Sequence, residues 1–168
     1  IGDLLGAMAV GVPSLQLVRG KKMPDSYQPQ PKQVMDVGIE ELIATANIIK
    51  KDPELTSAAD FLIGAVVRAR IPEPDWAAPR LLGKVAAGAQ YIQTQICLDL
   101  NVLRPFMAHL VSLKMLQRCS LIADIVVLPS AEDARWLRDN LVHVLIPNKV
   151  IRRLERARDP EQEGIDIC

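Results

Sequence analysis

The sequence predicts an α/β protein built around a parallel β-sheet, and two observations lead to this prediction. Apolar runs with strand character recur along the chain, and they alternate with longer segments that have helical periodicity. The repeats are spaced by roughly 30 to 40 residues, which is typical of βαβ units with right-handed crossovers. A doubly wound sheet and a (β/α)8 barrel both satisfy this pattern.

Four segments have the composition of strands. Residues 61–67 form a nearly continuous apolar run, as expected of a strand buried on both faces of a parallel sheet. Residues 12–18 and 91–96 are rich in strand formers. Residues 120–128 form the fourth run, which Pro129 closes.

Amphipathic helices are predicted between these strands. Residues 38–50 place one apolar stripe along a helix, which would cover a sheet and consists of Ile39, Leu42, Ile43, Ala46 and Ile49. Ser130 is a candidate N-cap, with Asp133 three residues further on. Further helices are expected at residues 3–10, 77–87, 98–113 and 131–141.

The number of strands bears on the extent of the domain. Four strands are about half of a (β/α)8 barrel, which usually needs roughly 250 residues. The chain opens on Ile1 within an apolar stretch and ends on Cys168 without a polar tail. We therefore interpret residues 1–168 as one partial barrel domain from a longer protein, unstable or self-associating on its own because its sheet edges are unpaired. Residues 21–37 lack periodicity and suit a loop over the carboxyl end of a strand.

Composition excludes several classes of function. The chain has 20 basic and 20 acidic residues, so no net charge favours nucleic acid. No apolar run reaches the roughly 18 residues of a membrane span, and no signal peptide is visible. The three cysteines are widely spaced and odd in number, which argues against a disulfide framework and a metal site. We expect a cytoplasmic protein.

Glycine-rich phosphate motifs are absent, since neither GxGxxG nor GxxxxGK[ST] occurs. The cluster Arg19-Gly20-Lys21-Lys22 follows the first strand and is a candidate for binding cofactor phosphates, the alternative being a solvated basic turn. His109 and His143 are too far apart in sequence to suggest a metal site. Cys97 has apolar neighbours and is interpreted as a buried structural thiol.

Gln93, Thr94 and Gln95 place polar groups at the end of an otherwise apolar strand, where each needs a partner or costs about 1 to 3 kcal/mol. Alternation sends Gln93 and Gln95 to the same face. In a barrel this strand end opens on the site, so Gln95, with Asp99 beyond it, could hydrogen-bond a polar heterocycle. The alternative is that these side chains tie down a neighbouring loop.

The segment from Lys84 to Gln95, followed by Asp99, resembles the KxxAGAxxIxTQxxxD segment of the methylenetetrahydrofolate reductase family. The stretch from Asp3 to the Arg19-Gly20 turn resembles the helix and strand that lead to the family's RGD or TGD turn. Further similarity follows in order, at Leu128-Pro129-Ser130, Ala134-Arg135-Trp136, Ile146-Pro147 and Glu163-Gly164-Ile165. The resemblance covers nearly the whole chain.

The resemblance implies a (β/α)8 barrel that binds FAD, of which this chain would supply about strands 4 to 7. The family takes hydride from NAD(P)H and reduces 5,10-methylenetetrahydrofolate to 5-methyltetrahydrofolate, in one-carbon and methionine metabolism. By position, Gln95 would contact folate and flavin, whereas Asp99 is a weaker match and is predicted to be a helix cap. Arg19, Gly20, Val67 and Lys84 would contact FAD, with Lys84 placed at its phosphates. The resemblance also allows a homo-oligomer or a partner subunit.

Three departures from the family pattern concern the site. Lys21 stands where the RGD or TGD turn has an aspartate, which reverses a local charge that would favour a cationic folate. Val67-Arg68 replaces a Tyr-Pro pair, and Ala77 replaces an acid. The family's general acid would precede Ile1, and the loop residues Asp25, Asp36 and Glu73 are candidate replacements for it. Two alternatives follow from these departures: a paralogue that binds folate or a partner without hydride transfer, and a flavin-free reductase.

Overall fold

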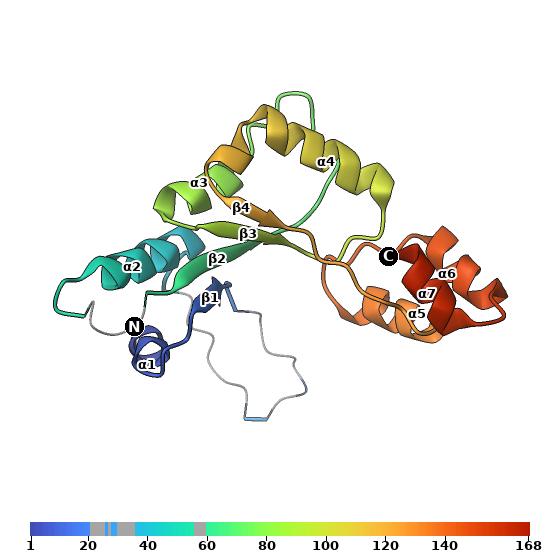
Figure 1. Ribbon diagram of the computed structural model, residues 1–168, viewed down its shortest axis with the longest axis horizontal. Helices are drawn as coiled ribbons and strands as arrows, with labels where there is room; N and C mark the ends of the chain where they lie inside the picture. The colour runs from blue at the N-terminus through green and yellow to red at the C-terminus, as the bar shows by residue number, and fades with distance from the viewer. Residues whose placement is uncertain (21–25, 27, 30–35, 56–59) are drawn as a thin grey trace. The chain divides into compact units, whose positions relative to one another are not determined.

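The computed structural model describes residues 1–20, 26, 28–29, 36–55 and 60–168. Four strands alternate with helices, so the α/β class is confirmed (Figure 1). The strands follow one another in the order β1-β2-β3-β4. The elements are α1 (Gly2–Ala9), β1 (Ser14–Leu17), α2 (Ile39–Lys51), β2 (Leu62–Val67), α3 (Pro79–Ala87), β3 (Tyr91–Thr94), α4 (Leu100–Ser112), the 3₁₀ turn η1 (Met115–Gln117), β4 (Ser120–Ile122), α5 (Ala131–Asn140), α6 (Asn148–Arg156) and α7 (Pro160–Ile167).

The chain divides into two compact units. Unit 1 comprises Ile1–Val66 and Ala78–Tyr91, and unit 2 comprises Val67–Ala77 and Ile92–Cys168. The first unit therefore holds α1 to α3 with β1 and most of β2. The second holds the loop after β2, most of β3, and everything that follows.

In unit 1, β1 and β2 pair in parallel, with Ser14 opposite Leu62 and Leu17 opposite Ala65. Helix α2 packs against β1 and against α3 (Figure 1). The contact is made by the apolar stripe that the sequence predicted, since Ile43 and Ala46 are fully buried. The core of this unit is therefore a two-layer packing of helices on strands.

Lys50 ties the end of α2 to the start of β2. Its ammonium donates to Phe61 O at 2.9 Å and to Gln90 Oε1 at 3.0 Å, and it forms a 2.8 Å salt bridge with Asp60. Gln90 Oε1 also accepts from Ile63 N at 3.1 Å. These hydrogen bonds pair backbone groups at the start of β2, and they connect α2, β2 and the turn after α3.

In unit 2, the helices α5, α6 and α7 form a group at the end of the chain, in which α6 contacts both others (Figure 1). Their core joins Leu128 and Ala134 to Val150, Ile151 and Leu154. Pro147 precedes α6 and Asp159 caps α7, where it accepts from Gln162 N at 3.1 Å. Helices α6 and α7 were not predicted from the sequence.

Among the predicted elements whose extent differs from the structure, two have a clear local cause. The run expected as a strand over residues 120–128 is strand only over Ser120–Ile122, because the backbone of Asp124 bonds instead to the Thr94 side chain and to Cys97. The helix expected from residue 77 begins at Pro79, because Ala78 has a φ of 50° and lies outside the helical region. The predicted caps at Ser130 and Asp99 are confirmed, since each side chain accepts from its helix's first turn.

Gly164, in the middle of α7, is required by close packing. A Cβ at this position would overlap the carbonyl oxygen of Leu128, which is backbone and cannot swing away. Gly6 in α1 is also inside a helix, but no described residue outside its own helix has an atom within 4 Å of the place its Cβ would take. Substituting each of these two glycines by alanine therefore separates the effect of close packing on stability from the effect of helix propensity.

We predict that Gly164→Ala lowers the free energy of unfolding by about 1 to 3 kcal/mol, because overpacking outweighs the better helix propensity of alanine. Gly6→Ala should raise the free energy of unfolding by about 0.5 to 1 kcal/mol. Denaturant unfolding of the full chain measures both. Equal effects of the two substitutions would contradict the packing of α7 on Leu128.

Candidate functional site

The carboxyl ends of β1 and β2 gather basic residues in unit 1. Arg19 and Gly20 are exposed and follow Leu17, the last residue of β1. The Lys84 ammonium, near the end of α3, donates to Val66 O at 2.6 Å, one residue beyond the partner of Leu17. Arg19 and the Lys84 contact with Val66 therefore both lie towards the carboxyl end of the strand pair, whereas Lys21 lies outside the described residues.

Lys84 is held in a partly desolvated environment. Burial lowers the pKa of its ammonium below the ordinary value of 10.5; the nearby Glu40 carboxylate opposes this shift and the Arg80 guanidinium adds to it. An ammonium in these surroundings gains from an anion placed beside it, because the anion replaces lost hydration. The site therefore has the electrostatics of a phosphate or carboxylate contact.

In unit 2, β3 shows the predicted alternation. Ile92 and Thr94 are buried on one face, and Gln93 and Gln95 are half-buried on the other. Gln95 N donates to Val67 O at 2.9 Å, so these two predicted site residues are neighbours. Among the described residues, the Gln95 side-chain amide has no hydrogen-bond partner, and this leaves its donor and acceptor for a ligand.

Gln93 and Thr94 support the alternative interpretation, in which polar side chains tie down a neighbouring loop. Gln93 Nε2 donates to Asp124 Oδ1 at 2.6 Å, and Thr94 Oγ1 accepts from Asp124 N at 2.9 Å. Thr94 is only 1% exposed, so this bond satisfies a buried hydroxyl. Of the three polar residues, Gln95 alone has a side chain with no hydrogen bond within the described part of the chain.

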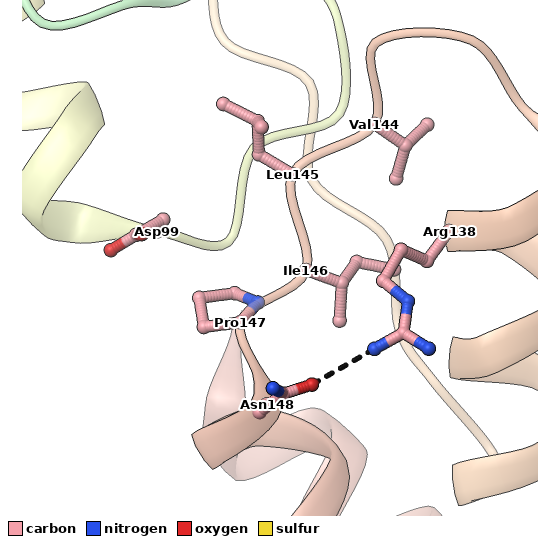
Figure 2. Close-up of a pocket in the computed structure, with 7 residues that line it drawn as sticks. All are labelled: Asp99, Arg138, Val144, Leu145, Ile146, Pro147 and Asn148. Atoms are coloured by element: carbon pink, nitrogen blue, oxygen red, sulfur yellow. Dashed lines mark hydrogen bonds between the residues drawn. The ribbon is translucent and has the colours of Figure 1, made fainter.

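A hollow of about 460 Å³ lies just past the end of β3 (Figure 2). Asp99 lines it from the start of α4, and residues 144–148 line it from the segment that leads into α6. That segment runs parallel to residues 96–98, with Leu98 N donating to Leu145 O at 2.9 Å and Leu145 N donating to Ile96 O at 3.0 Å. Sequence reasoning missed this pairing, although the apolar run before Pro147 was a signal for it.

The side chains around this hollow have structural partners. Arg138 Nη1 donates to Asn148 Oδ1 at 2.9 Å, as Figure 2 shows, and Arg138 Nε donates to Asp139 Oδ1 at 3.0 Å. Asp99 Oδ1 accepts from Asn101 N at 3.1 Å, which makes Asp99 the cap of α4. Its predicted role as a cap is confirmed.

The remaining nucleophile and metal candidates are structural. Cys97 is buried, and burial raises the pKa of its thiol, as expected of an unreactive cysteine. His109 Nε2 donates to Trp76 O at 2.6 Å and its ring stacks on the indole. Within the described part of the chain, no cluster of three His, Cys, Asp or Glu side chains is arranged to hold a metal ion. None of the helices there is long and apolar enough to cross a membrane.

These observations define an α/β protein with cationic and amide side chains at the carboxyl ends of its strands. The sequence pattern of the family described as methylenetetrahydrofolate reductase matches residues 3–167. The chain therefore belongs to the methylenetetrahydrofolate reductase family, a family of oxidoreductases. No curated protein matches the chain in a direct sequence comparison. Family membership implies that the four strand and helix repeats form a portion of a (β/α)8 barrel.

The lowered pKa of Lys84 predicts a stability effect with a definite sign. The folded state binds this proton less tightly than the unfolded state, so the charged lysine destabilises the fold below its lowered pKa. This penalty is relieved as the pH rises through the lowered pKa towards 10.5. The free energy of unfolding of the wild type should therefore rise, relative to Lys84→Met, as the pH approaches 10.5.

Denaturant unfolding at a series of pH values from 7 to about 10.5 tests this prediction. Lys51→Met, at an exposed lysine on α2, is the matched control for the loss of a lysine side chain. A difference between the wild type and Lys84→Met that stays constant with pH would contradict the desolvation of Lys84.

Proposed function

We propose that this protein takes part in the flavin-dependent reduction of 5,10-methylenetetrahydrofolate to 5-methyltetrahydrofolate, with NAD(P)H as the source of hydride, in cytoplasmic one-carbon metabolism. The observation that supports this function best is Gln95, whose amide is left for a ligand at the end of β3, within the TQ motif of a chain that belongs to this family. The proposal includes that residues 1–168 correspond to about strands 4 to 7 of the barrel.

The residues at the ends of β1 and β2 fit FAD in charge. A dinucleotide carries a diphosphate, and Lys84 is a partly desolvated ammonium that uses one of its three donors on Val66 O. Arg19 adds an exposed guanidinium, and no atom of the described residues lies within 4 Å of where a Cβ would stand on Gly20. Arg19, Gly20 and Lys84, which all belong to unit 1, would hold the diphosphate. FAD would supply a carrier that accepts hydride and passes it on.

Gln95 would orient the folate ring. Its side-chain amide offers both N–H donors and a carbonyl acceptor, and the 2-amino-4-oxo ring of folate presents groups of both kinds. The bond from Gln95 N to Val67 O fixes the backbone from which this amide projects. A positioned amide of this kind lowers the barrier by holding the reacting carbon in place.

We predict that Gln95→Ala lowers kcat/KM for methylenetetrahydrofolate by about 10 to 100-fold, the cost of losing one or two hydrogen bonds to the substrate. The free energy of unfolding should hardly change, because the lost amide has no partner among the described residues. Gln93→Ala, on the same face of the same strand, is the matched control. It should lower the free energy of unfolding by about 1 to 3 kcal/mol, because it removes the donor to Asp124.

An absorbance spectrum of the purified full-length protein tests the function itself. We expect flavin bands that bleach when NADH or NADPH is added without oxygen, and that recover when methylenetetrahydrofolate is added. Lys84→Gln should weaken flavin binding by about tenfold or more, whereas Lys51→Gln should leave it unchanged. A protein without flavin that still binds folate would exclude the flavoprotein reductase and favour the binding paralogue or a flavin-free reductase.

A further inference from the structure

Asp124 lies two residues beyond the end of β4 and is half-buried. Nothing in the sequence pattern assigns it a function. Its carboxylate accepts from Gln93 Nε2 at 2.6 Å, and Gln93 shares its face of β3 with Gln95. The structure thus places a carboxylate on the same side of the strand as the amide that is left for a ligand.

The backbone of Asp124 is fixed at two points. Asp124 N donates to the buried hydroxyl of Thr94 at 2.9 Å, and Asp124 O accepts from Cys97 N at 3.4 Å. With the Gln93 bond, three contacts to β3 and its continuation hold one acidic residue in place. A side chain fixed in this way meets a ligand without first losing much conformational entropy.

The charge of Asp124 is not balanced within the described part of the chain. No salt bridge there joins its carboxylate to a lysine or arginine. The amide of Gln93 stabilises the carboxylate with a hydrogen bond but carries no opposite charge. A half-buried carboxylate held in this way is suited to receive N–H donors or a positive charge from a ligand.

We propose that Asp124 is a substrate-binding residue that acts together with Gln95 and recognises the N–H donors of the folate ring. This inference rests on the proposed function, because it takes folate as the ligand of Gln95. The adjacent ring N–H and amino group of a 2-amino-4-oxo pyrimidine form a pair of donors, which a carboxylate can accept side by side. Asp124 would thereby supply an acidic contact in a chain that has Lys21 in its basic turn.

Asp124→Asn is the informative variant. Asparagine keeps the size of the side chain and an Oδ1 that accepts from Gln93, but it removes the charge and replaces one acceptor with a donor. Asp75→Asn is the control, since Asp75 is exposed and lacks a hydrogen bond or salt bridge in the part of the chain that is described. Asp124→Glu keeps the charge and tests whether a carboxylate restores binding.

The measurement is the affinity of the full-length protein for two probes, 5-methyltetrahydrofolate and p-aminobenzoylglutamate, which lacks the ring. Asp124→Asn should lower the affinity for 5-methyltetrahydrofolate by about tenfold or more and leave the affinity for p-aminobenzoylglutamate unchanged. Asp124→Glu should bind 5-methyltetrahydrofolate more tightly than Asp124→Asn does. A merely structural role would weaken both probes equally. It would also lower the midpoint of denaturant unfolding, which we expect to stay near that of the wild type.

Three results would overturn the inference. One is unchanged 5-methyltetrahydrofolate affinity in a folded Asp124→Asn; another is an equal loss for both probes. If Asp124→Asn does not fold, Asp124→Glu takes its place in the comparison. The third result is then a folded Asp124→Glu that binds p-aminobenzoylglutamate as the wild type does but does not bind 5-methyltetrahydrofolate. If the wild-type protein binds neither probe, the proposed function itself fails, which separates that outcome from a failure of Asp124 alone.

Discussion

Parallel pairing is the constraint on which the candidate site depends. Because β1 and β2 run in the same direction, their carboxyl ends lie at one edge, where Arg19 follows β1 and the Lys84 ammonium bonds to Val66 O in β2. The same rule applies to β3, where Gln95 follows the last residue of the strand and Asp124 bonds to its neighbours. The chemistry is therefore concentrated at strand ends, where residues are free of the requirement to pack on both faces.

Local signals in the sequence were sufficient for the caps and for most helices. Ser130 and Asp99 act within their own helical turns, so their roles depend on a few neighbouring residues. Helix α6 also had a readable signal, since Val150, Ile151 and Leu154 are spaced to share one buried face. The end of β4 had no such signal in the sequence. The strand stops because the backbone of Asp124 hydrogen-bonds to Thr94 and Cys97, which are both distant in sequence.

For the site residues, too, the sequence predicted some roles and could not predict others. Gln95 was identified because a partly buried amide at the end of an apolar strand needs a hydrogen-bond partner. The structure gives that amide no partner among the described residues. Gln93 has the same residue type and faces the same side, yet it bonds to Asp124. Nothing in the order of residues separates the two glutamines, because the difference lies in what a later strand brings beside each of them. Tertiary contacts decide which polar group is structural and which is available.

The division of the chain into units has a consequence for how the protein is made. The chain passes between the units three times, after Val66, after Ala77 and after Tyr91. During synthesis, residues 67–77 therefore leave the ribosome well before their packing partners, Phe106 and His109, exist to receive Trp76. Unit 1 is therefore assembled from two stretches of chain that a segment of unit 2 separates in the sequence. Neither unit can be cut out as one continuous piece, so exchange of segments between relatives would have to respect all three crossings.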